Sequence, residues 1–315
     1  MNSLPINVDS GEFSWSFSRR SIYERCPRAY FYRYYGAQKG WDKFEQPEKK
    51  HLYVLKNLKK TEAWLSNILS EAAQKVFMSN HTGLSDTLLG KSLYMETIRN
   101  YNKNCEELRN GEWRDDPKKL NLFELYYNNE DSFDFPFSKQ SKLKQRLLNA
   151  LNNFVQSSLF YELEDVQSLS WKILKRPVSF FFNGVTVWTS PHLAWASNGK
   201  FKILNFQLNQ PESEGSQNLL NGLNSLLVQQ KFMAKPENIQ CLTFYYETDG
   251  GLLRKSENID TTEAERLISE SSMEMLAKIS IENKVFEADF PKCCADFADC
   301  NNLCEFQEHC VEANY

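Results

Sequence analysis

Apolar residues recur at helical spacing through the first half of the 315-residue chain. From about Tyr53 to Met78 they stand three or four positions apart, which predicts one long amphipathic helix. Residues 87–109 and 138–165 show the same period on either side of a polar stretch that contains two prolines. Residues 1–165 are therefore expected to be mainly helical.

A further helix is predicted near the N-terminus. Ser16 or Ser18 can cap its start, and Gly36 is a plausible end. Pro27 lies inside the helical pattern, where a proline removes a hydrogen bond and clashes with the preceding turn. The sequence therefore predicts two short helices that meet at Cys26.

The pattern changes from helices to strands after residue 165. RPVSFFFNGVTVW predicts a hairpin that turns at Asn183-Gly184, because this dipeptide adopts the left-handed backbone of a tight hairpin turn. HLAWAS and KFKILNFQLN predict two more strands around Asn198-Gly199, followed by a helix over 215–233, the strand IQCLTFYYE and a helix over 261–281. This order predicts an α/β or α+β fold in one domain, with a sheet core at 166–290 and a cysteine-rich tail at 291–315.

Composition narrows the class of protein. Eight cysteines are too few for a disulfide scaffold in a chain of this length, and the first residues lack a basic region followed by an apolar run. No stretch reaches the roughly 18 apolar residues of a membrane-spanning helix. We expect a cytoplasmic protein without membrane contact.

Charge is distributed unevenly along the chain. Residues 1–60 contain twelve Lys or Arg against six Asp or Glu, whereas residues 257–315 contain four against fourteen. The basic N-terminal segment is either a nucleic-acid surface or the solvated side of helices.

Cysteines gather near both ends of the chain: Cys26 in ERCPRAYFYRYYG, and Cys300, Cys304 and Cys310 in CNNLCEFQEHC. Thiolate ligands select iron–sulfur clusters or zinc. Spacing alone does not pair two segments more than 270 residues apart, and four unconnected buried thiols are the alternative.

Five segments together resemble the RecB-like branch of the PD-(D/E)xK nuclease superfamily, in particular its members that carry an iron–sulfur cluster. These are SFSRRSIYERCPRAYFYRYYG, WLSNILSE, GVTVWTSPHLAW, FKILNFQLN and the cysteine tail. The resemblance covers nearly the whole chain and implies a restriction-endonuclease-like mixed sheet flanked by helices, with an N-terminal helical region and insertion. It also implies a [4Fe–4S] cluster held by Cys26, Cys300, Cys304 and Cys310. Three residues lie between Cys300 and Cys304 where two are commoner, so Cys293 and Cys294 are spare candidates, and zinc is the alternative metal.

The catalytic positions depart from the family pattern. The family uses a His-Glu pair on a helix, the Asp of a PD pair, and an Asp-x-Lys on the next strand. The corresponding residues here are Ser70-Glu71, Pro191-His192 and Asn205-Phe206-Gln207. The family's Gln-x3-Tyr pair aligns with Leu220 and Asn224.

These substitutions change the expected chemistry. Ser70, His192, Asn205 and Gln207 supply neither the anionic oxygens that hold Mg²⁺ nor an ammonium group, so Mg²⁺ is not expected to bind well. Only Glu71 is retained. Glu71, Glu212, Glu214, Lys200 and Lys202 are the nearby residues from which a relocated site could be built. Strand alternation sends Lys202 to the opposite face from Asn205 and Gln207, however, and glutamates just past a strand are more often solvated loop charges. The sequence therefore predicts a pseudo-nuclease.

One function follows from this prediction, and two alternatives stay open beside it. The first is a DNA-binding or scaffolding subunit of a DNA-processing or phage-defence complex, which works with a helicase or nuclease partner. The second is an active Mg²⁺-dependent nuclease with a rearranged site, and the third is a pure protein-interaction component. For the first function, the candidate phosphate contacts are the N-terminal arginines, while the neighbouring tyrosines stack on bases or pack in the core. These arginines are Arg19, Arg20, Arg25, Arg28 and Arg33.

Overall fold

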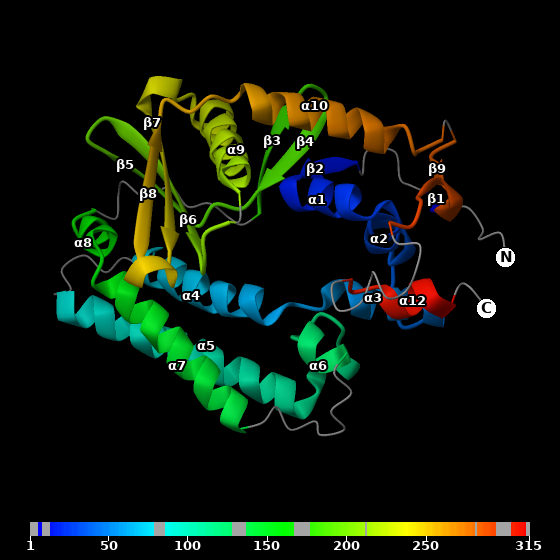
Figure 1. Cartoon of the computed structure of the whole chain (residues 1–315), viewed down its shortest axis with the longest axis horizontal. Helices are drawn as coiled ribbons and strands as arrows, with labels where there is room; N and C mark the ends of the chain where they lie inside the picture. Colours follow the sequence, from blue (N-terminus) through cyan, green and yellow to red (C-terminus); the bar gives the residue numbers. More distant parts are fainter. Residues whose placement is uncertain are drawn as a thin grey trace.

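The computed structural model describes residues 6–7, 13–78, 86–127, 137–166, 177–211, 213–280, 282–293 and 304–312. It is a mixed α/β protein in which long helices of the N-terminal half lie along one side of a strand region (Figure 1). The predicted α/β class is confirmed at this level. None of the helices in the described ranges combines the length and the low polarity that a membrane span requires.

The N-terminal helices meet at Cys26, as predicted. Helix α1 spans Phe17–Arg25, and the Ser16 side chain caps it by accepting the backbone N–H of Arg19 at 3.1 Å. Cys26 is extended, with φ −158°, and is followed by α2 at Pro27–Phe31 and a π-helical turn at Tyr32–Gly36. Pro27 occupies the first position of α2, where its missing N–H costs nothing.

The single helix predicted from Tyr53 to Met78 is wrong. The structure has α3 at Pro47–Asn57 and α4 at Thr61–Met78. The backbone of Lys59, which lies between them, pairs with a distant segment: it donates to the carbonyl of Asn121 at 3.0 Å and accepts the N–H of Phe123 at 2.9 Å. This long-range bridge interrupts a pattern that local periodicity reads as continuous.

The remaining N-terminal helices follow the predicted segments closely. Helix α5 spans Asp86–Asn110, a 3₁₀ turn Glu112–Arg114 and a short α6 Phe123–Tyr127. The helix predicted over 138–165 is two helices, α7 at Phe137–Val155 and α8 at Ser158–Glu164. Ser157 separates them and caps α8 through the N–H of Phe160 at 3.2 Å.

Both predicted Asn-Gly hairpins are confirmed. Strands β3 (Val178–Phe182) and β4 (Val185–Thr189) pair antiparallel, as do β5 (Leu193–Ser197) and β6 (Lys200–Gln207). Asn183 has φ 46° and Asn198 has φ 51°, the left-handed conformation that these turns require. Strand β4 also pairs in parallel with β2 (Ser14–Ser16), so the chain's N-terminal segment contributes to a three-stranded sheet.

A four-stranded sheet is arranged in the order β5-β6-β7-β8. Helix α9 (Glu214–Phe232) connects β6 to the parallel strand β7 (Ile239–Tyr245), and β8 (Leu252–Glu257) returns antiparallel along the edge. Short 3₁₀ turns at Pro236–Asn238 and Thr248–Gly250 flank β7. Strand β8 was not predicted from the sequence.

The C-terminal part closes against the N-terminal helices. Helix α10 spans Thr262–Leu276, so the helix predicted over 261–281 ends earlier than expected. Strand β9 (Lys284–Val285) pairs with β1 (Ile6–Asn7), a 3₁₀ turn spans Glu287–Asp289, and α12 spans Gln307–Glu312. Figure 1 shows α12 beside α3, with β9 beside β1.

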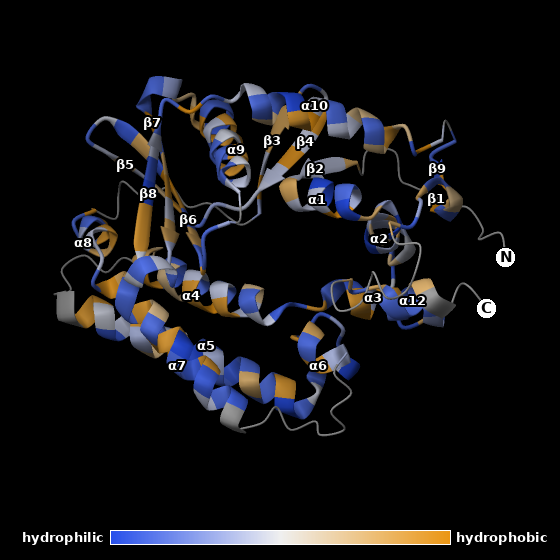
Figure 2. Cartoon of the chain, viewed as in Figure 1, coloured by the Kyte–Doolittle hydropathy of each residue, from blue (hydrophilic) through white to orange (hydrophobic). Residues whose placement is uncertain are grey.

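The four-stranded sheet separates two hydrophobic cores. Leu204 and Phe206 of β6 join the core that contains α4, α5, α7 and α8. Ile203 of the same strand faces the other core, which contains α9, α10 and the N-terminal helices. In Figure 2 the apolar residues of α9 and of the strands accordingly lie toward the interior. Even and odd positions of β6 therefore point to different halves of the molecule.

Candidate functional site

Two of the positions that the resemblance assigns to catalysis, His192 and Asn205, lie opposite each other near the carboxyl end of β6. Leu193 of β5 pairs with Leu204 of β6, so the preceding residue, His192, lies opposite Asn205. The backbone N–H of His192 donates to the carbonyl of Leu204 at 2.8 Å, which extends the ladder by one step. His192 and Asn205 are both buried.

The imidazole of His192 makes contacts within the protein. Its Nδ1 accepts the backbone N–H of Phe206 at 3.2 Å, and its ring lies edge-on to the Phe206 ring at 5.6 Å between centroids. Accepting this bond requires an unprotonated Nδ1. The aspartate expected at this position is thus replaced by a side chain that is held against the β6 backbone.

Helix α4 contacts His192 through the side chain of Gln74. The side-chain amide of Gln74 donates to the carbonyl oxygen of His192 at 3.0 Å. Ser70 lies one turn earlier on the same helix face, fully buried, and its hydroxyl donates to the carbonyl of Ser66 at 2.7 Å. Ser70 therefore satisfies its polar atom within its own helix.

Asn205 and Gln207 face α9 together with polar residues of the neighbouring strand. Across the parallel ladder Asn205 pairs with Thr243 and Gln207 with Tyr245, so all four side chains share one face. Above them Gln217 of α9 donates to the hydroxyl of Thr243 at 2.8 Å and accepts the hydroxyl of Tyr245 at 2.5 Å.

This polar layer continues along α9 and was missed by the sequence analysis. Asn221 accepts from Gln217 at 3.0 Å and donates to Ser256 of β8 at 3.0 Å. Asn224 is fully buried and accepts the hydroxyl of Thr189 at 3.2 Å. The available signal was the helical spacing of Gln217, Asn221 and Asn224. The alignment had considered only Leu220 and Asn224.

The nearby charged residues point away from this layer or are paired. Glu71 and Glu214 are exposed, and Glu212 lies outside the described residues. Lys202 is buried on the opposite face, as predicted, and its ammonium pairs with the carboxylate of Glu162. Lys200 pairs with Glu257 at 2.5 Å, and this bond lowers the pKa of the Glu257 carboxyl.

A second candidate site surrounds Cys26. Its buried thiol caps α2 by accepting the backbone N–H of Ala29 at 3.4 Å. The thiols of Cys26 and Cys293 are in hydrogen-bonding contact, and Cys304 and Cys310 lie close enough for electrostatic interaction with Cys26. The structure thus brings the two ends of the chain together at these cysteines.

Cys26 is buried, Cys304 and Cys310 are half-buried, and Cys293 is exposed. Burial raises the pKa of Cys304 to about 12 and that of Cys293 to about 11, and the Cys26 thiol adds to the shift at Cys293. The backbone N–H of Phe306 contacts the Cys304 thiol and partly opposes its shift. N–H groups directed at sulfur are the outer contacts that cysteine-ligated clusters use.

The described cysteines do not by themselves form a closed set of ligands. Within the ranges given above, no group of three or more His, Cys, Asp or Glu side chains could hold a metal ion as arranged. Cys300 and Cys294, two of the candidate ligands, lie outside the described residues. The soft donor type fits an iron–sulfur cluster or zinc, and Cys293 is the spare candidate that contacts Cys26.

The arginines predicted to contact nucleic acid have partners inside the protein. Arg28 bonds the carbonyl of Phe290 at 2.7 Å and pairs with Glu287, while Arg25 and Arg33 both pair with Glu305, at 3.6 and 3.1 Å. Their role in DNA binding stays a prediction. The structure shows what sequence could not: basic N-terminal and acidic C-terminal residues neutralise each other.

The other two arginines are also engaged. Arg19 is buried, donates to the carbonyl of Ser14 at 2.7 Å and lies 4.2 Å from the centre of the Tyr34 ring. Arg20 pairs with Glu24 at 2.5 Å.

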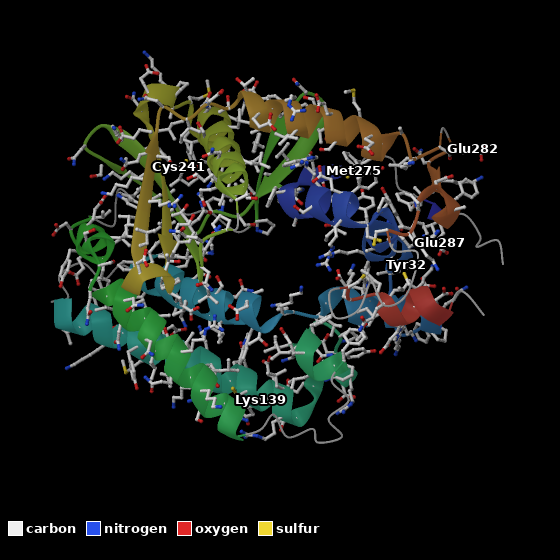
Figure 3. All side chains as sticks on the ribbon, viewed as in Figure 1. Tyr32, Lys139, Cys241, Met275, Glu282 and Glu287 are labelled. Atoms are coloured by element: carbon white, nitrogen blue, oxygen red, sulfur yellow. The ribbon has the colours of Figure 1, made fainter. Side chains whose placement is uncertain are left out.

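The tyrosines of the same segment are core residues. Tyr30 and Tyr32 are almost fully buried, and the Tyr32 hydroxyl donates to Glu287 at 2.8 Å. Figure 3 shows Tyr32 and Glu287 close to each other. Burial raises the pKa of Tyr32 well above its ordinary value. Of the two roles considered for these rings, packing is the one that the structure shows.

Comparison of the chain with protein-family models gives no match, and comparison with curated proteins gives none either.

Proposed function

We propose that this chain is a catalytically degenerate PD-(D/E)xK nuclease-like protein that binds DNA without cutting it. It serves as a DNA-binding or scaffolding subunit of a DNA-processing or defence complex, alongside a helicase or nuclease. A structural iron–sulfur cluster at Cys26, Cys304, Cys310 and a fourth cysteine holds the chain ends together.

The observation that carries the proposal is the placement of His192 opposite Asn205. The segment before β5 and strand β6 bring His192 and Asn205 together where the resemblance expects metal-binding groups. Gln74 of α4, one turn after Ser70, donates to the His192 carbonyl at the same place. Hydrolysis there would require anionic ligands for Mg²⁺. Here the two positions are occupied by the His192 imidazole, which accepts the Phe206 N–H, and by the buried amide of Asn205. These neutral groups support a former metal site whose arrangement of strands is retained and whose anionic ligands are lost.

The arrangement of the strands also supports the proposal. A strand meander followed by a crossover helix and a strand parallel to β6 is the order that the resemblance implies for the nuclease core. Replacing two carboxylates with neutral groups removes repulsion against a phosphate backbone. DNA binding without cleavage is the function that both features favour.

Restoring the family residues tests the proposal. The variant combines Ser70→His, His192→Asp, Asn205→Asp and Gln207→Lys, and a linear DNA substrate is incubated with it and Mg²⁺. We expect Mg²⁺-dependent cleavage from this variant, and a Mg²⁺-dependent rise in its thermal stability, because the ion would neutralise the two added carboxylates.

The matched control retains His192→Asp and Gln207→Lys but carries Asn205→Ala. It should neither cleave DNA nor gain stability with Mg²⁺. If the folded four-residue variant shows neither effect, the assignment of these positions to a former nuclease site is wrong.

A further inference from the structure

The segment between the π-helical turn and α3 exposes two aromatic rings. Phe44 is 85% exposed and Trp41 is 57% exposed, and only two residues lie between them. Lys39 and Lys43 are exposed beside them. We call Lys39, Trp41, Lys43 and Phe44 the Trp41 patch.

The Trp41 patch is held in a fixed shape. The backbone N–H of Asp42 donates to Lys39 at 2.8 Å, that of Glu45 donates to Asp42 at 3.1 Å, and the Asp42 carboxylate accepts the N–H of Phe44 at 3.0 Å. Gly40 packs so closely on α3 that a Cβ there would lie 2.3 Å from the carbonyl oxygen of Lys49. The rings are therefore presented on an ordered turn, which lowers the entropy cost of binding.

Trp41 packs against one aromatic neighbour. Its ring lies edge-on to the Tyr53 ring of α3, with 5.7 Å between centroids, while more than half of the residue remains open to solvent. Phe44 has the Lys43 ammonium 4.9 Å from its ring centre. An aromatic ring with a cation beside it is the element that single-strand-binding proteins use for a base and its phosphate.

The charge around the patch is positive. Residues 37–60 contain seven lysines against one aspartate and two glutamates, and Glu45 is occupied by Lys49 at 3.3 Å. Within the described ranges, neither Lys39 nor Lys43 forms an ion pair, in contrast to the N-terminal arginines. The Lys43 ammonium lies over the Phe44 ring, and no carboxylate of the described residues pairs with either lysine.

We propose that the Trp41 patch binds single-stranded DNA, with bases stacked on Trp41 and Phe44 and phosphates held by Lys39 and Lys43. Unpaired bases are the ligand because duplex stacking hides the faces that exposed rings would contact. This inference rests on the proposed DNA-binding function and assigns it a surface and a strand state.

The test measures the binding of a fluorescently labelled oligothymidylate and of a duplex of equal length by anisotropy, over a series of salt concentrations. The variants are Trp41→Ala with Phe44→Ala, and Lys39→Ala with Lys43→Ala. The controls remove exposed residues elsewhere: Phe181→Ala with Tyr161→Ala for the rings, and Lys91→Ala with Lys235→Ala for the charges.

We expect the ring variant to bind the oligothymidylate at least about tenfold more weakly, with an unchanged salt slope. The lysine variant should bind more weakly and lower the salt slope by about 1 to 2. Both control pairs should bind like the unaltered protein.

Three outcomes overturn the inference, and they separate its failure from that of the proposed function. If the unaltered protein binds single strands and the ring variant binds them equally well, the Trp41 patch is not the surface, and DNA binding by another face stands. If the unaltered protein binds no DNA of either form, both proposals fail. Loss of a protein partner without loss of oligonucleotide binding in the ring variant would make the patch a protein-docking surface instead.

Discussion

Asn205 is a polar residue in a buried position, 4% exposed, and among the described residues its side-chain nitrogen has no hydrogen-bond partner. An amide tolerates this position because it carries no charge. A carboxylate would not, since burying an unpaired charge is costly.

Asn205→Asp alone should therefore lower the free energy of unfolding at pH 7 by roughly 2–4 kcal/mol. Burial raises the pKa of the new carboxyl above its unfolded value, so the deficit should be small at pH 4 and should grow as the pH rises through the unfolded pKa. Chemical denaturation at both pH values measures it. An equal deficit at pH 4 and pH 7 would contradict the buried, uncompensated charge.

Lys56 offers a second residue-scale test. Burial, together with the nearby Arg33, lowers the pKa of Lys56 to about 8. Because the unfolded chain binds this proton more tightly, the charged lysine destabilises the folded state below pH 8, and the effect fades as the pH rises toward the unfolded pKa. Lys56→Met should therefore raise the melting temperature at pH 7 and raise it less at pH 10.

The control for Lys56 is Lys59→Met, which removes an exposed lysine three residues away. It should show no gain that depends on pH. A gain in Lys56→Met that is the same at pH 7 and pH 10 would rule out the buried charge as its cause.

At the scale of elements, Glu305 connects the C-terminal segment to the N-terminal helices. Its carboxylate, 13% exposed, pairs with Arg25 and Arg33, and its carbonyl accepts the hydroxyl of Tyr127 at 2.6 Å. Three elements from distant parts of the sequence therefore meet at one residue.

Glu305→Gln should loosen this junction because it leaves two guanidinium groups without their shared carboxylate. We expect a loss of about 1–3 kcal/mol in unfolding free energy and faster amide hydrogen exchange at residues 304–312. Glu263→Gln is the matched control, because Glu263 pairs with Arg266 at the surface, where such pairs contribute little. Equal behaviour of the two variants would contradict the role given to Glu305.

A helix or strand boundary can be predicted from the sequence when the contacts that fix it lie within a few residues. The hairpins at Asn183-Gly184 and Asn198-Gly199 and the break at Cys26 follow from turn and proline chemistry within a few residues. The break between α3 and α4 depends on Lys59 pairing with a segment some sixty residues away, which periodicity does not register. Strand β8 was missed because its sequence, LLRKSE, shows no clear alternation along the sheet edge.

The same distinction applies to the candidate sites. The altered residues Ser70, His192, Asn205 and Gln207 can be read directly from sequence, and strand alternation correctly separates Lys202 from Asn205. The internal partners of the arginines could not be predicted, because Glu287 and Glu305 are more than 250 residues away from them. Opposite net charges at the two ends of the chain were the only sign of these pairs.

At the scale of the whole molecule, the proposed cluster would join the two ends of the chain. Cys26→Ser, Cys304→Ser and Cys310→Ser should each remove the visible absorption, iron and sulfide of anaerobically purified protein and lower its melting temperature. Cys241→Ser is the control, because this buried thiol bonds the carbonyl of Asn221 within the sheet core. Retention of iron in Cys26→Ser would contradict the joining of the two ends by a cluster.

The fourth ligand is identified by the same assay on Cys293→Ser and Cys300→Ser. Family spacing favours Cys300, whereas contact with Cys26 favours Cys293. Loss of iron in one variant and retention in the other assigns the ligand. Zinc in place of iron and sulfide would leave the joined ends intact and change the metal.

The central claim, that the protein binds DNA without cleaving it, is tested most directly with the unaltered protein. Purified with its metal intact, it is mixed with labelled single-stranded, duplex and forked DNA, with Mg²⁺ or Mn²⁺ present, while binding and strand integrity are followed together. The account predicts binding that weakens steeply with salt, and DNA that stays whole. Metal-dependent cleavage, or no binding to any of the three DNAs, would contradict it.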